Sequence, residues 1–144
     1  MNAKEYLSRY RQALIKADGI RDSIAELRQR QEQVGSPAFS DLPKGSSDGD
    51  LANYIARLDA RERRLNTQLQ LCAQICEEIE HTLEILGKDY PIEAAMLRKR
   101  YIAGKAWETI AAEMGYSTSH TYTLHGKALF YVSKILFQCE DSSE

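Results

Sequence analysis

The chain has 144 residues, of which 43% are hydrophobic and 28% are charged, with only 8 glycines and 3 prolines. This composition is usual for a water-soluble helical protein, and it excludes collagen-like and wholly disordered chains. The formal net charge is -2, so the overall composition does not indicate nucleic acid as a partner. Such a partner has to be inferred from local features.

Cysteine usage and hydropathy predict a cytoplasmic protein. Cys72 and Cys76 lie within an apolar helical pattern, and with Cys139 they make an odd number, so we expect no secreted disulfide framework. The first residues hold no apolar signal core, and no window approaches the roughly 18 uninterrupted apolar residues of a membrane helix. We therefore expect neither export by that route nor a membrane as a partner.

The first predicted element is a long amphipathic helix over residues 2–34. No proline interrupts this stretch, and its apolar or near-apolar positions recur at helical spacing. These positions are Leu7, Tyr10, Leu14, Ala17, Ile20, Ile24, Leu27 and Val34. Residues 35–49 then collect turn formers and two of the three prolines, so they predict a connecting loop.

A second long helix is predicted from Asp50, as its cap, to about Leu86, with Gly87 as the stop signal. Its apolar stripe alternates steps of four and three without a slip, which is typical of a coiled-coil seam. The seam holds Leu51, Ile55, Leu58, Glu62, Leu65, Leu69, Cys72, Cys76, Ile79, Leu83 and Leu86. Residues 1–88 are thus predicted to form a long helical coiled-coil hairpin with its loop at 35–49.

Apolar side chains beside this seam predict a homodimer. A two-helix hairpin buries one stripe of each helix, whereas Tyr6, Tyr54 and Ile75 fall next to that stripe. A second copy would cover them. The alternative is a hairpin that folds back on the C-terminal domain, which would cover the same positions within one chain.

Residues 89–137 change to short helices separated by small turns. Pro91 suits a first helical position, and a helix is predicted over 92–102. Its inward residues are expected to be Ala95, Met96, Leu97 and Tyr101. A short helix follows at 106–114, with Trp107 as an inward anchor.

A tight turn at Gly115 and Tyr116 leads to the last predicted helix, which Ser117 or Thr118 caps. The inward face of this helix is expected to hold Thr121, Leu124, Ala128, Leu129, Val132 and Leu136. The order of short helix, tight turn and longer helix is that of a helix-turn-helix, whose second helix enters the major groove of DNA. Residues 138–144 then form an acidic tail.

Two motifs in this part of the chain carry a family resemblance. Trp107-Glu108-Thr109-Ile110-Ala111 precedes the turn, and Lys127-Ala128-Leu129 follows it. The run from Arg98 to Leu136 thereby resembles region 4 of bacterial sigma factors. With Arg100-Tyr101-Ile102 and Ser117 included, it is similar to the region-4-like regulators of Gram-positive phages and prophages, grouped with the ArpU and RinA type late-gene activators.

The resemblance implies an all-α, three-helix domain of the sigma region 4 type that binds double-stranded DNA, and it allows contact with RNA polymerase. The groove-facing residues would be Thr118, Ser119, His120, Tyr122 and Thr123, with His125 or Lys127 nearer the DNA backbone. Arg98 and Arg100, on the preceding helix, could contact phosphate. A solvated helix face explains the two arginines equally well.

The second helix departs from the family pattern in its charge. Sigma factors place several arginines at its start, whereas this chain has no lysine or arginine between Gly115 and Gly126. Hydroxyl, phenol and imidazole groups release few counterions, so one copy should bind DNA weakly. In a dimer, DNA binding by one copy would raise the effective concentration of the second copy's DNA-binding domain.

The sequence does not predict an enzyme, a metal site or a cofactor. It contains no Gly-rich phosphate loop, no G-x-S-x-G elbow and no H-E-x-x-H motif. We therefore expect a sequence-specific transcriptional regulator. The alternatives are an adaptor that binds RNA polymerase or another phage protein without reading DNA, and a structural coiled-coil protein.

Overall fold

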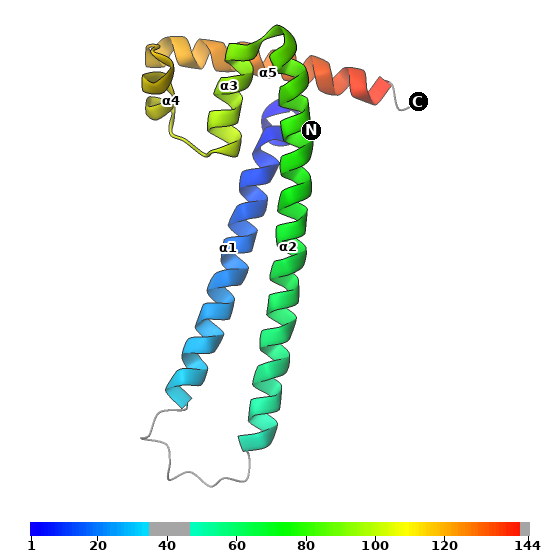
Figure 1. Ribbon diagram of the computed structural model, residues 1–144, viewed down its shortest axis with the longest axis vertical. Helices are drawn as coiled ribbons and strands as arrows, with labels where there is room; N and C mark the ends of the chain where they lie inside the picture. Colours follow the sequence, from blue (N-terminus) through cyan, green and yellow to red (C-terminus); the bar gives the residue numbers. More distant parts are fainter. Residues whose placement is uncertain (35–46, 142–144) are drawn as a thin grey trace. The chain divides into compact units, whose positions relative to one another are not determined.

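The computed structural model describes residues 1–34 and 47–141, and every element in these two stretches is helical (Figure 1). The elements are α1 (Ala3–Val34), α2 (Ser47–Asp89), α3 (Pro91–Leu97), a π-helical turn η3 (Arg98–Ile102), α4 (Trp107–Met114) and α5 (Thr118–Asp141). The predicted all-α class is therefore confirmed. Among the helices described, none is both long enough and apolar enough to cross a membrane.

Several helix boundaries differ from those predicted. α2 begins at Ser47, so Asp50 lies within its first turn, and α2 continues through Gly87 to Asp89. The rest of the predicted loop, residues 35–46, lies outside the described residues. α5 continues to Asp141 and includes the first part of the expected acidic tail.

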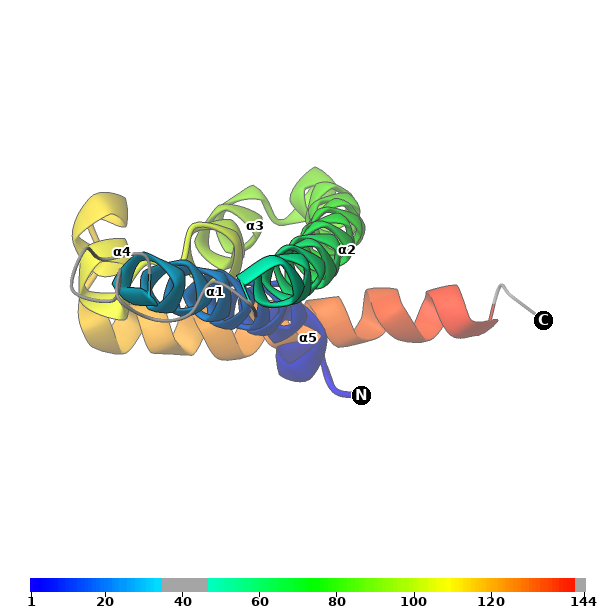
Figure 2. The same ribbon diagram turned by 90° about the horizontal axis from the view of Figure 1, so that it is seen from below.

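Packing divides the chain into two units. The terminal unit combines Met1–Gln12 with Cys72–Glu144, and the hairpin unit is Ala13–Leu71. The start of α1 and the last part of α2 thus pack with α3, η3, α4 and α5. Within the terminal unit, α4 lies beside the beginning of α5, and the end of α5 projects beyond the other helices (Figures 1 and 2).

The core of the terminal unit combines the end of the predicted seam with the C-terminal helices. It contains the fully buried residues Leu7, Ile79, Met96, Leu97, Ile110, Ala128 and Val132. On α3 the buried alanine is Ala94 and not the predicted Ala95, which is exposed. The other predicted inward residues, Met96, Leu97 and Tyr101, are buried, so periodicity was wrong only at Ala95.

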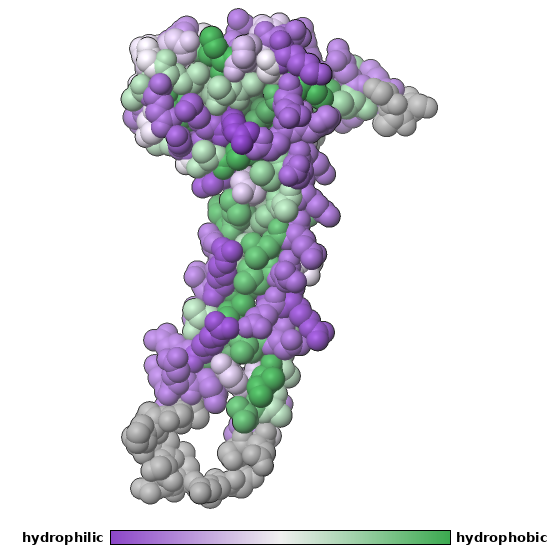
Figure 3. Space-filling view, in the orientation of Figure 1, coloured by the Kyte–Doolittle hydropathy of each residue, from purple (hydrophilic) through white to green (hydrophobic). Residues whose placement is uncertain are grey.

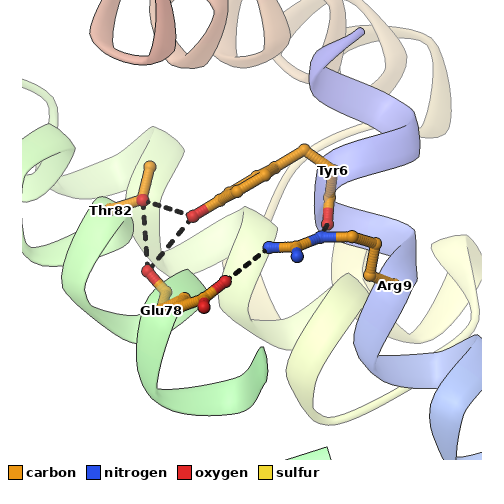
Figure 4. Close-up of polar contacts among 4 residues, drawn as sticks. All are labelled: Tyr6, Arg9, Glu78 and Thr82. Carbon is orange, nitrogen blue, oxygen red and sulfur yellow. Dashed lines mark hydrogen bonds and ion pairs between the residues drawn. The ribbon is translucent and has the colours of Figure 1, made fainter. Parts of the chain in front are cut away.

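Polar contacts near the start of α1 close this core on one side. The Tyr6 hydroxyl lies 2.8 Å from the Thr82 hydroxyl, and the Arg9 guanidinium pairs with the Glu78 carboxylate at 2.9 Å (Figure 4). Ile75 is also buried within the chain. Two of the three positions that favoured a second copy beside the hairpin are therefore covered or bonded inside one chain.

In the hairpin unit, α1 buries the apolar side chains of Ala17, Ile24 and Leu27, and polar contacts also join α1 to α2. Arg61 Nη1 donates to the Ser23 carbonyl oxygen at 2.8 Å, and Gln68 Nε2 donates to that of Ala13 at 3.0 Å. Leu51 and Ile55 of the predicted seam stay 48% and 55% exposed. Hydrophobic surface is visible near the start of α2 (Figure 3).

The turn between α4 and α5 has two stabilising features, both predicted from the sequence. Gly115 adopts a left-handed conformation with φ of 73°, and the Tyr116 N–H donates to the Ala111 carbonyl oxygen at 2.9 Å, as in a Schellman motif. The Ser117 hydroxyl then accepts a hydrogen bond from the His120 N–H at 3.1 Å. Ser117 is therefore the N-cap of α5.

Replacing Gly115 tests this turn. A Cβ at Gly115 would meet nothing within 4 Å, so Gly115→Ala isolates the backbone strain, and we expect a loss of about 1 kcal/mol in the free energy of unfolding. Gly126→Ala is the matched control. It adds the same methyl group to open space within helix α5, and it should raise stability by roughly 0.5–1 kcal/mol.

Urea denaturation followed by circular dichroism measures both changes. Equal effects of the two substitutions would contradict the role of the left-handed residue.

Candidate nucleic-acid interface

The first two turns of α5 present the predicted groove-facing residues to solvent. Thr121 points inward: it is fully buried, and its hydroxyl donates to the Ser117 carbonyl oxygen at 2.9 Å. The exposed residues around it are Thr118, Ser119, His120, Tyr122 and Thr123. The five side chains therefore share one accessible surface at the start of the helix.

Aromatic contacts stiffen this surface. Tyr122, 49% exposed, packs against Trp107 of α4 with ring centroids 5.6 Å apart. His120 meets the Tyr116 ring edge-on at 4.8 Å. Because each ring rests on a neighbour from the turn or from α4, the two side chains are held in position before any ligand binds.

Trp107 is less buried than predicted. It is only partly covered, with His125 edge-on at 4.4 Å and the Arg100 guanidinium 4.9 Å from its ring centroid. Because it lies between α5 and η3, it joins these elements at the edge of the exposed surface. The helical spacing that predicted an inward anchor could not distinguish the middle of the core from its edge.

His125 is half-buried and packs between Trp107 and Tyr101. Its Nε2 is 2.8 Å from the Tyr101 hydroxyl, and burial, with smaller effects from the Lys4 and Arg100 charges, lowers its pKa to about 4. His125 is therefore neutral near pH 7. Of its two ring nitrogens, Nε2 is engaged by Tyr101, and an approach of His125 to the DNA backbone stays a prediction.

The basic residues before the turn are held by groups of the same chain. Arg98, which we expected to contact phosphate, forms an ion pair with Glu80. Arg100, the second such residue, donates to the Lys105 carbonyl oxygen at 3.0 Å. Both arginines belong to η3, where the Ala103 N–H bonds to the Arg98 carbonyl oxygen in the wide pattern of a π turn.

Glu113 of α4 binds two further lysines. Its Oε2 lies 2.7 Å from Lys99 Nζ, and its Oε1 lies 2.7 Å from Lys105 Nζ. Hydrogen bonds from Lys105 and Lys99 hold the pKa of Glu113 below its ordinary value. We call these three residues the Glu113 clamp. Sequence patterns did not predict this clamp, because its members lie on three different segments.

Lys127 differs from these residues because its ammonium group lies over an aromatic ring. Its Nζ is 5.8 Å from the Tyr131 ring centroid, and the residue is exposed. Of the three basic residues predicted to contact DNA, it is the one located on α5 itself.

In the described part of the chain, no three His, Cys, Asp or Glu residues lie close enough to hold a metal ion.

Comparisons with known proteins do not place the chain in a family. No family model, curated protein or solved structure matches it. The interpretation of this surface therefore depends on its geometry and on the residue pattern.

The lowered pKa of His125 predicts a pH-dependent stability. Between about pH 4 and 6.5 the unfolded chain binds a proton that the folded His125 does not, so this contribution to stability is complete above pH 6.5 and falls as the pH decreases to 4. His125→Gln should flatten the curve of melting temperature against pH in this range.

His120→Gln, which removes an exposed histidine from the same helix, should leave the slope of that curve unchanged. If His125→Gln kept the wild-type slope of melting temperature against pH, the burial of His125 would not contribute to the pH dependence of stability.

Proposed function

We propose that this chain is a sequence-specific, DNA-binding transcriptional regulator of phage or prophage type, which acts in the cytoplasm by binding and not by catalysis. The observation that carries the proposal is the rotation of α5. Thr121, Ala128 and Val132 are completely buried, so the hydroxyl, imidazole and phenol groups at the start of the helix face outward. A helix-turn-helix presents its recognition residues in the same way.

The chemistry of the exposed side chains suits the edges of bases. Thr118, Ser119 and His120 can donate or accept hydrogen bonds, and the Thr123 methyl group can contact the methyl group of thymine. The N-terminus of α5 adds the positive end of the helix dipole, which favours a nearby phosphate. These groups support readout of a groove, although they supply little net charge.

The shortage of free cations supports an assembly with two reading heads. Arg98, Lys99 and Lys105 are each paired with a carboxylate, so a single copy neutralises few phosphates and should bind DNA weakly. A homodimer would join two weak contacts into one stronger one. We therefore include self-association in the proposed function.

The same ion pairs also favour a second candidate function, an adaptor that binds RNA polymerase or another phage protein through this domain. A protein partner does not require the positive field that DNA requires, and the aromatic cluster of Trp107, Tyr122 and His120 suits a protein interface. Pull-down of RNA polymerase after nuclease treatment, without retention of promoter DNA, would favour the adaptor.

The recognition surface is tested by removing its two rings. We expect His120→Ala and Tyr122→Ala each to weaken binding to the chain's own upstream DNA about tenfold, since each removes roughly 1–3 kcal/mol of contacts to bases. Fluorescence anisotropy at two salt concentrations measures the loss. Ile92→Ala removes an exposed side chain from α3 and serves as the control with unchanged affinity.

If both ring variants bound specific DNA as the wild type does, this surface would not be the DNA-binding site.

The Glu113 clamp gives a gain-of-affinity test. Glu113→Gln should release Lys99 and Lys105 for phosphate contacts, increase DNA affinity, and steepen the slope of log K against log salt by up to about 2. Glu108→Gln is the matched control, because Glu108 is also an exposed α4 glutamate, whereas the two lysines bond to Glu113. If the two variants gave equal slopes, the clamp would not limit phosphate binding.

A further inference from the structure

The C-terminal half of α5 carries two exposed phenylalanines that the proposed function does not use. Phe130 is 56% exposed and Phe137 is 66% exposed. They belong to an outward stripe with alternating steps of three and four residues. We call it the α5 stripe, and it consists of Lys127, Phe130, Lys134, Phe137 and Asp141.

The chain itself covers this stripe only slightly. Ala128 and Val132 on the opposite side of the helix are fully buried, which turns the stripe outward, and the end of α5 projects beyond the other helices of the terminal unit (Figures 1 and 2). The Lys134 ammonium lies 4.6 Å from the Phe130 ring centroid. Two large rings at heptad spacing on a projecting helix are typical of a helix-pairing surface.

We propose that the α5 stripe binds the same stripe of a second copy of this chain, with the two helices antiparallel. A two-fold axis between Ser133 and Lys134 places Phe130 opposite Phe137 of the second copy, and Phe137 opposite its Phe130. Each aromatic ring thereby gains an aromatic partner, and both rings leave water.

The charges along the α5 stripe favour a second copy of this chain as the partner and an antiparallel direction of pairing. The stripe has a lysine at one end, Lys127, and a carboxylate at the other, Asp141, so an antiparallel copy brings opposite charges together at both ends. Only Lys134 then lies near its own counterpart. A parallel copy would oppose like charges at Lys127, Lys134 and Asp141, which costs free energy at three of the five layers. The stripe is therefore complementary to itself in one direction.

This pairing has a consequence for DNA that rests on the proposed function. With 1.5 Å rise per residue, the two Tyr122 residues would lie about 35 Å apart along the paired helices, which is close to the roughly 34–36 Å of one turn of B-DNA. Lys127 would face the acidic end of the second copy and contribute less to phosphate binding than the sequence predicts.

Analytical ultracentrifugation of the full chain without DNA tests the pairing. We expect a concentration-dependent dimer, and we expect Phe130→Ser with Phe137→Ser to raise its dissociation constant at least about 30-fold. The control combines Ile15→Ser with Ile92→Ser, which removes two other exposed apolar side chains, 69% and 46% exposed, and should dimerise as the wild type does. Circular dichroism verifies that each variant is folded.

A charge exchange tests the direction. Lys127→Glu should weaken the dimer, and adding Asp141→Lys should restore it, because the opposite pairing is then re-formed between copies. A wild-type chain that stays monomeric at every concentration would overturn the proposal.

The proposal would also be overturned by a dimer that survives the double phenylalanine substitution, or by one that is lost only with Leu51→Ser and Ile55→Ser. Since no DNA is present, these outcomes leave the DNA-binding proposal to its own experiments.

Discussion

The rotation of α5 about its own axis is the constraint on which the rest of the terminal unit depends. Thr121, Ala128 and Val132 have no exposed surface, and the Ser117 cap sets where the helix begins. Adjacent residues on a helix lie about 100° apart. A shift of one residue in the packing or in the start of α5 would therefore turn Tyr122 toward the core and Thr121 toward solvent. The exposed surface at the start of α5 and the α5 stripe are both consequences of this one packing arrangement.

Neighbouring carboxylates balance the positive charges of several basic residues in the terminal unit. Glu80 and Glu113 pair with three cations near the α4–α5 turn, Arg98, Lys99 and Lys105. All these groups are partly or largely exposed, and exposed ion pairs contribute little to stability and are screened by salt. They can therefore exchange partners with an incoming anion at low cost. The clamp is therefore a reversible arrangement of charges and not a main support of the fold.

Sequence patterns predicted the helices and the α4–α5 turn well, because Gly115 and Ser117 act on their immediate neighbours. They predicted less where distant segments meet. The apolar stripe of α2 is uniform, yet Leu86 is buried and Leu51 is exposed, since only one end of the stripe meets the C-terminal helices. The position of His125 under Trp107, and the π turn at Arg98–Ile102, likewise depend on tertiary packing that periodicity does not encode.

Trp107 is the only tryptophan in the chain, and its ring touches His125 and Tyr122 of α5 as well as Arg100 of η3. Its indole emission therefore originates from the junction of α4, α5 and η3 and from nowhere else in the protein. An unlabelled sample carries its own optical probe at that junction. Undocking of α4 from α5 would change the spectrum even when the long helices keep their circular dichroism signal.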